Sequence, residues 1–260
     1  MEYLKETDTK EFIKRLPDLT INPLNVHLLM LAVRSRKARE IMGFKVKDLV
    51  IERRIIRPIF RLPEQKLDFT DWREKYFNSV YNLSILQHQG RYSVKGVLAP
   101  PEAMGIFATL SPRNVMSANA DLMKENITYL YQGDDASKME IAKLSSRHFG
   151  MLHRHKDRGS NFVTLDIDNG DKALFKEILD KVSMLPIFMA TETSRGYHIV
   201  LNLIKPEDAR LFYGENALIQ QLGLAYAKKG LEIQKDSQEP VAGTLYYREK
   251  GVVHYVTILQ

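Results

Sequence analysis

The sequence contains no cysteine among its 260 residues. This absence excludes disulfide bonds, thiol catalysis, iron–sulfur clusters and zinc sites with cysteine ligands. Any metal ion that the chain binds must therefore be held by aspartate, glutamate or histidine side chains.

Long apolar runs are also lacking. No stretch of about 18 consecutive apolar residues occurs, so the sequence predicts no transmembrane helix and no membrane partner. The first residues, MEYLKETDTKEF, are polar and lack the apolar stretch of a secretory signal peptide. We therefore expect a cytoplasmic protein, and a composition of 44% hydrophobic and 27% charged residues predicts an ordinary globular core.

Negative charge is scarce at one end of the chain. The formal net charge is +6, and residues 1–61 account for all of it, with 14 Lys and Arg against 8 Asp and Glu. A localised basic region suits a polyanion such as nucleic acid. A solvated helix face rich in lysine and arginine would give the same count, and charge alone does not separate the two.

The first 95 residues are predicted to be mostly helical. Val26, Leu29, Met30 and Val33 recur at helical spacing, and Gly43 follows as a stop signal. Helices are predicted over 9–16, 24–41 and 68–86, whereas 45–61 is compatible with helix or strand. We interpret residues 1–95 as a basic, helical accessory region.

Strands and helices alternate in the remainder of the chain. Strands are predicted over 92–98, 105–110, 162–168, 186–190, 196–203, 243–248 and 252–259, and helices over 112–126, 137–150, 171–183 and 206–229. This pattern predicts an α+β fold, with residues 96–260 as the catalytic core.

Asp166 and Asp168 form the first candidate motif, at the end of the apolar strand FVTLDID. Residues i and i+2 of a strand point to the same face, so the two carboxylates are expected to lie side by side. A divalent cation would relieve their repulsion, and hard cations such as Mg²⁺ prefer carboxylate oxygens. A polar strand end that faces solvent is the alternative.

Arg195-Gly196-Tyr197-His198 forms the second candidate motif, just before an apolar strand. Glycine permits close approach of a ligand to the backbone, while Arg195 and His198 supply donors suited to phosphate oxygens. The alternative is a glycine turn followed by a core strand with one structural histidine.

Asp236 is the third candidate, in the stretch KDSQEPVAGT, which leads to Arg248. By itself this stretch is typical of a surface loop between a helix and a hairpin. The three motifs gain meaning from their order and spacing.

That ordered set resembles the archaeo-eukaryotic primase superfamily, over roughly residues 100–260. The family combines a strand-borne Asp-x-Asp, a later Gly-x-His that often follows Arg, and a further Asp. Here the matching positions are Asp166 with Asp168, Gly196 with His198, and Asp236. Residues 108–113 resemble an Asn-Pro-Arg segment of some members, although Ser111 replaces the Asn.

The resemblance implies a catalytic lobe like an RNA-recognition motif beside a smaller α/β lobe, and a primase or polymerase that transfers nucleotides from (d)NTPs. Asp166, Asp168 and Asp236 would hold Mg²⁺ or Mn²⁺. Triphosphate would be bound by His198, Arg195, Gly196 and Arg248. Single-stranded DNA is the expected template, and a replicative helicase is the expected partner protein.

Two other functions are compatible with the sequence. His153-Arg154-His155 and Tyr226 provide a His-x-His and a tyrosine nucleophile, as in rolling-circle replication initiators and relaxases. That hypothesis leaves the three aspartates unexplained. The residue between the two histidines, Arg154, is charged, whereas this motif usually has an apolar residue there. A catalytically inactive nucleic-acid-binding replication protein is the second alternative, against which the intact set of acids and His198 argues.

Overall fold

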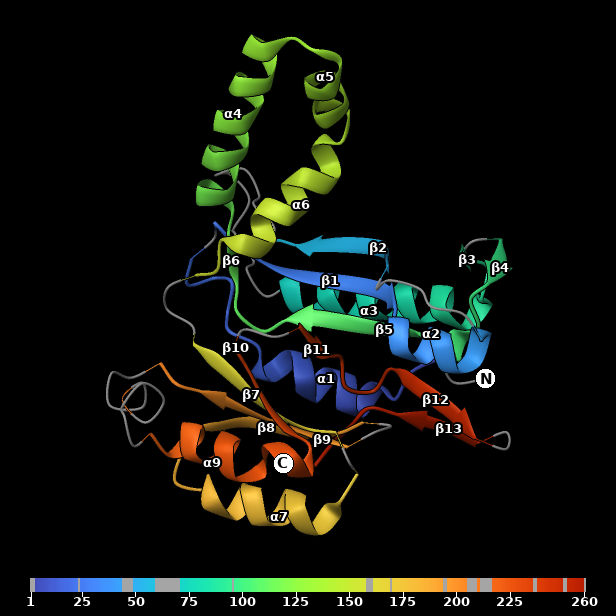
Figure 1. The fold of residues 1–260 in the computed structure, drawn as a ribbon, viewed down its shortest axis with the longest axis vertical. Helices are drawn as coiled ribbons and strands as arrows, with labels where there is room; N and C mark the ends of the chain where they lie inside the picture. Colours follow the sequence, from blue (N-terminus) through green and yellow to red (C-terminus); the bar gives the residue numbers. More distant parts are fainter. Residues whose placement is uncertain are drawn as a thin grey trace.

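The computed structural model describes residues 3–22, 24–43, 49–58, 71–94, 96–157, 161–168, 170–193, 196–204, 210, 217–235, 238–249 and 252–259. Within these ranges, helices accompany two five-stranded sheets, one above the other in Figure 1. The α+β class predicted from the sequence is therefore confirmed. None of the described helices combines the length and the apolar composition needed to cross a bilayer.

The first sheet joins the two ends of the chain. Its antiparallel strands are ordered β11 (Gln238–Pro240), β5 (Met104–Thr109), β1 (Asn25–Val33) and β2 (Leu49–Ile56), and β6 (Arg113–Asn114) pairs with the start of β1. The chain therefore returns after more than 100 residues to complete this sheet beside β5.

The predicted helix over 24–41 is wrong for residues 25–33, which form β1; helix α2 occupies only Ser35–Met42. Every residue of β1 is buried. Leu28 and Met30 belong to one apolar core, and Leu29 and Leu31 belong to another on the opposite face. A strand covered on both faces is apolar at every position, so its residues also satisfy helical spacing.

The N-terminal region is not a helical unit of its own. The helices predicted near its start and end are present as α1 (Glu6–Arg15) and α3 (Asp71–Gln89), but the undecided segment contains β2. Because β1 and β2 form one sheet with β5 and β11, the proposed boundary at residue 95 runs through a continuous sheet.

The second sheet comes from the later part of the chain. Its antiparallel strands are ordered β10 (Leu231–Lys235), β7 (Phe162–Ile167), β9 (Tyr197–Asn202), β8 (Ile187–Glu192) and β14 (Thr257–Ile258). The strands predicted over 162–168, 186–190 and 196–203 are confirmed, whereas β10 and β11 were not predicted.

Two apolar cores hold the second sheet in place. Helices α7 (Lys172–Lys181) and α9 (Leu218–Tyr226) pack on one face, at the bottom of Figure 1. Of the predicted helix 206–229, the structure describes α9 with Ala217 before it, the 3₁₀ turn Ala227–Lys229 and residue 210; 206–209 and 211–216 lie outside the described residues. Phe162, Met189 and Val200 join the core of the first sheet instead, with residues of α1 and α3.

Short elements complete the described part of the fold. The predicted strand over 92–98 is a hairpin of β3 (Ser93–Val94) and β4 (Val97–Leu98), followed by the 3₁₀ turn Pro101–Ala103. A second hairpin, β12 (Leu245–Glu249) with β13 (Val252–Tyr255), confirms the late strand pair.

A helical arm projects away from the two sheets in Figure 1. It comprises α4 (Val115–Gln132), α5 (Asp135–Ala142) and α6 (Leu144–Arg154). The Asn114 side chain accepts a hydrogen bond from the backbone of Ser117, so α4 begins after Asn114 rather than at Pro112. The single helix predicted over 137–150 is two helices.

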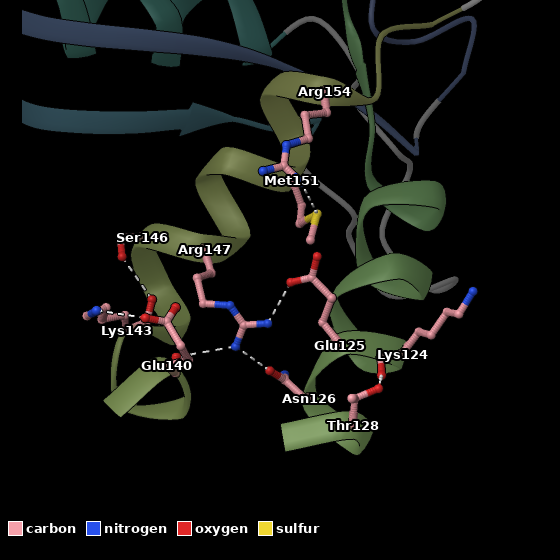
Figure 2. A network of polar contacts seen from close by, with 10 residues as sticks. All are labelled: Lys124, Glu125, Asn126, Thr128, Glu140, Lys143, Ser146, Arg147, Met151 and Arg154. Atoms are coloured by element: carbon pink, nitrogen blue, oxygen red, sulfur yellow. Dashed lines mark hydrogen bonds and ion pairs between the residues drawn. The ribbon is translucent and has the colours of Figure 1, made fainter. Parts of the chain in front are cut away.

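Arg147 connects the helices of this arm, as Figure 2 shows. Its guanidinium donates to Glu125 at 2.8 Å, to Asn126 at 2.7 Å and to the backbone oxygen of Glu140 at 3.3 Å. It also lies 4.6 Å from the centre of the Tyr129 ring. The guanidinium of Arg147, whose side chain is only 11% exposed, therefore satisfies acceptors from both sides of the arm.

Candidate functional site

A cavity of about 190 Å³ lies between the two sheets. The second sheet contributes Asp166, His198, Glu232 and Gln234, and Asp168 and Thr193 follow its strands. The first sheet contributes Met104, Gly105, Phe107, Gln238 and Pro240, with Arg34 and Tyr246 nearby. Residues from distant parts of the chain therefore meet in one polar space.

Asp166 and Asp168 both line this cavity, as their alternation on the strand predicts. Asp166 lies near the end of β7, with its side chain only 16% exposed. Asp168 follows β7, where its backbone N–H donates to the oxygen of Gly230 at 3.0 Å. Two carboxylates are thus placed on the same side of one strand.

His198 stands next to Asp166 on the neighbouring strand. The two residues are direct partners in the β7–β9 register, and His198 Nε2 lies 3.4 Å from an Asp166 carboxylate oxygen. The other ring nitrogen, Nδ1, lies 2.7 Å from a carboxylate oxygen of Glu239. The imidazole is therefore held between two acids.

Glu239 belongs to β11 of the first sheet and is only 1% exposed. Its second carboxylate oxygen accepts a hydrogen bond from the hydroxyl of Thr164 on β7. This glutamate was not among the residues predicted for the site. It ends a polar stretch, and the only signal in the sequence is that Pro240-Val241-Ala242 follows it directly.

The pKa values at this cluster reflect burial and close charges. Burial raises the pKa of Asp166, and the charges of Asp168, Glu239 and Glu232 raise it further, against the lowering effect of His198. Burial lowers the pKa of His198, but the charge and hydrogen bond of Glu239 and the charge of Asp166 outweigh it, so the net shift is upward. The site therefore favours a cationic imidazolium among carboxylates.

A third carboxylate of the cavity lies on β10. Glu232 is the direct partner of Asp166 in the β10–β7 register, and Gln234 Nε2 donates to Asp166 at 3.1 Å. Asp236, the predicted third acid, lies outside the described residues. Its neighbour Lys235 pairs with Val163, three residues along β7 from Asp166.

Arg34 brings positive charge to the cavity from the first sheet. It follows β1, its side chain is exposed, and its guanidinium lies 4.7 Å from the centre of the Phe107 ring. Its charge is close enough to His198 to oppose protonation of the imidazole. Arg34 falls in the basic region recognised in the sequence, but its place in this cavity was not predicted.

The structure describes only some of the residues that are predicted to bind triphosphate. His198 lines the cavity, Arg195 lies outside the described residues, and Arg248 is on β12 with a side chain that is not described. Close packing explains why residue 196 is a glycine, because a Cβ there would lie 1.6 Å from the backbone oxygen of Ile167. The glycine thus allows close approach to β7.

The chemistry of the acids suits Mg²⁺ or Mn²⁺. Among the described residues, no three acidic or histidine side chains converge as ligands of one ion. Mg²⁺ is commonly held by only one or two carboxylates, with water and substrate phosphates as its other ligands. Asp166 and Asp168 fit that mode, and Glu232 adds charge beside them.

The residues on which the relaxase alternative depends make other contacts in the structure. Tyr226 is buried in the core between α7, α9 and the sheet, and its hydroxyl donates to Glu177. His155 Nε2 lies 2.8 Å from Asp121, and His153 contacts Gln238. These contacts give that alternative no assembled nucleophile and metal site among the described side chains.

Comparisons with protein-family models, with curated proteins and with solved structures give no match.

Proposed function

We propose that this chain is a DNA primase or polymerase of the archaeo-eukaryotic primase type. It would transfer nucleotides from (d)NTPs onto a strand directed by a single-stranded DNA template. The observation that carries the proposal is the meeting of Asp166 and Asp168 with two basic groups, His198 and Arg34, in one cavity.

This distribution of charge matches a metal-bound nucleoside triphosphate. Carboxylates on β7 suit divalent cations, while an imidazolium and a guanidinium suit phosphate oxygens. A cavity with only acids would bind cations without the nucleotide, and one with only bases would bind any phosphate. The combination favours a reaction in which metal and triphosphate act together.

In this proposal Asp166 and Asp168 hold Mg²⁺ or Mn²⁺, with Glu232 or Asp236 as a further acid. The metal would activate a 3′-hydroxyl and stabilise charge on the pyrophosphate leaving group. His198 donates from Nε2 to a triphosphate oxygen, and Arg34 pairs with another. The second sheet with α7 and α9 takes the place of the lobe like an RNA-recognition motif.

Nucleotide incorporation tests the proposal. The protein is incubated with single-stranded DNA, dNTPs or NTPs, and Mg²⁺ or Mn²⁺, with and without a primer. We expect template-dependent products from the wild type, a loss of at least about 100-fold in Asp166→Asn, and normal activity in Asp180→Asn, which removes the charge of an exposed acid on α7.

Two results would contradict the proposal in different ways. A wild-type protein without product under every condition would exclude the polymerase function. Full activity in Asp166→Asn would exclude this site. A covalent protein–DNA adduct that is lost in Tyr226→Phe would instead support the relaxase alternative.

A further inference from the structure

The ring of His198 is oriented by a residue from the opposite sheet. His198 is on β9, whereas Glu239 is on β11, and their side chains meet at 2.7 Å. Glu239 is almost completely buried, and a buried carboxylate is stable only when charged or hydrogen-bonding partners surround it. Two of its partners, His198 and Thr164, belong to the second sheet.

We propose that Glu239 is the positioning residue of the nucleotide site: it accepts the Nδ1–H of His198 and thereby aims Nε2–H at the triphosphate. This inference rests on the proposed function. It assigns Glu239 a specific role that differs from metal binding, because its carboxylate oxygens are directed at Thr164 and His198 rather than at Asp166 and Asp168.

The geometry explains why a carboxylate is needed at this position. A carboxylate only accepts hydrogen bonds, so Nδ1 must carry a proton where it faces Glu239. Nε2–H can then donate to phosphate in the imidazolium, in which both ring nitrogens are protonated. Without this acceptor the ring could turn, or lose its second proton and present an unprotonated nitrogen to the phosphate. The bond to Thr164 fixes the carboxylate, so the acceptor itself has one orientation.

The position of Glu239 also ties the site to the contact between the sheets. Glu239 pairs with Ala108 of β5, and His198 pairs with Asp166 of β7. Each partner is therefore fixed within its own sheet, and the bond between them forms only when the two sheets are correctly apposed. A shift between the sheets would release the imidazole before it displaced either strand.

Three variants test this role. Glu239→Gln keeps the shape but removes the charge, Glu239→Asp keeps the charge on a shorter side chain, and Glu192→Gln removes an exposed charge at the end of β8, outside the cavity. The ¹⁵N and ¹H NMR signals of the His198 ring, assigned with His198→Gln, report which ring nitrogens carry a proton and whether the Nδ1 proton is hydrogen-bonded, without any nucleotide.

We expect Glu239→Gln to weaken the hydrogen bond of the Nδ1 proton, seen as an upfield shift of its signal, and to raise the KM for dNTP about tenfold, with kcat changed by less than about threefold. Glu239→Asp should recover part of the affinity, and Glu192→Gln should resemble the wild type. A purely structural glutamate would instead lower the stability to urea and the active fraction, at unchanged KM.

The outcomes separate the two claims. A wild-type His198 signal in Glu239→Gln, or an unchanged KM, overturns the positioning role even when the wild type incorporates nucleotides. A wild type that incorporates none overturns the proposed function and with it the nucleotide role of Glu239. The wild-type NMR signal then still decides whether the Glu239–His198 bond exists.

Discussion

Glu232 lies directly opposite Asp166 in the antiparallel pair of β10 and β7. Lys235, the last described residue before Asp236, is three pairs away, which corresponds to about 10 Å along the strands. Facing residues of two strands have side chains within about 5.5 Å of each other. Position 232 is therefore closer to Asp166 than position 235, the neighbour of Asp236. Glu232 is thus well placed to share a metal ion with the acids of β7.

This register predicts different metal affinities for two variants. Glu232→Gln should weaken Mn²⁺ binding about tenfold, because it removes a carboxylate beside Asp166, whereas Asp236→Asn should weaken it less. Electron paramagnetic resonance of free Mn²⁺, titrated with protein in the absence of nucleotide, measures both. The reverse order of effects would assign the third acid to Asp236, as the spacing of the motifs predicts.

Arg34 should affect nucleotide binding more than turnover. Arg34→Gln removes a guanidinium from the cavity, and the loss of one charge-assisted contact to phosphate is expected to raise the KM for dNTP about tenfold. Arg39→Gln is the matched control, because this exposed arginine of α2 is not among the residues that line the cavity. Equal effects of the two variants on steady-state KM would show that only overall charge matters.

His27 makes the stability of the fold depend on pH. Burial lowers the pKa of this fully buried imidazole from 6.5 to about 4, and its Nε2 lies 3.0 Å from the backbone oxygen of Pro17. The folded state thus binds the proton less readily than the unfolded state. The contribution of the neutral His27 to the free energy of unfolding is fully present above the unfolded pKa. It is lost as the pH drops from there towards the folded pKa.

The expected loss from His27 is about 2 kcal/mol between about pH 7.5 and about pH 5. Urea unfolding at the two pH values measures it. In His27→Gln the stability at high pH is lower, but this part of the pH dependence should disappear. An unchanged pH dependence in the variant would assign the loss to other groups.

Gly196 should not tolerate a side chain. Alanine there would place Cβ 1.6 Å from the backbone oxygen of Ile167, and strand pairing leaves that oxygen little freedom to move. We expect Gly196→Ala to destabilise the protein by about 3 kcal/mol or more. Gly150→Ala in α6, where a Cβ meets nothing within 4 Å, should be neutral or stabilising by up to about 1 kcal/mol. Thermal unfolding of both variants tests the contrast.

Arg147 should stabilise the arm locally. Replacing it with methionine leaves Glu125 and Asn126 without their common donor and should cost about 2 kcal/mol. Hydrogen exchange should become faster in α4–α6 and stay unchanged in the two sheets. Lys143→Met removes only an exposed ion pair with Glu140 and should have little effect. Faster exchange throughout the protein would show that the arm and the sheets unfold together.

The strands β7, β8 and β9 and the helix α7 could be predicted because their patterns are unambiguous. The strand that carries Asp166 ends in a polar motif, and Asp171 caps α7 by accepting hydrogen bonds from Ala173 and Leu174. Alternation along the strand likewise predicted that Asp166 and Asp168 share a face, and such local signals can be read from a sequence. The place of His198 beside them was implied only by the resemblance that the ordered motifs carry.

Two kinds of feature could not be predicted. The apolar run of β1 matches both periodicities because both of its faces are covered, and only the pairing partners decide the structure. Glu239 and Arg34 join the site because the two sheets lie against each other, and the residues next to them in the sequence do not predict this contact. Such long-range contacts depend on the register of strands that are far apart in the chain.

The late arrival of β11 has a consequence for how the protein is made. The strands β1, β2 and β5 emerge from the ribosome long before residues 238–240, so the free edge of β5 remains unpaired while about half of the chain is synthesised. Because non-local pairings are slow to form, this edge stays open to wrong partners during that time. The three residues of β11 cover this edge and bring Glu239 to His198 at the same step of synthesis.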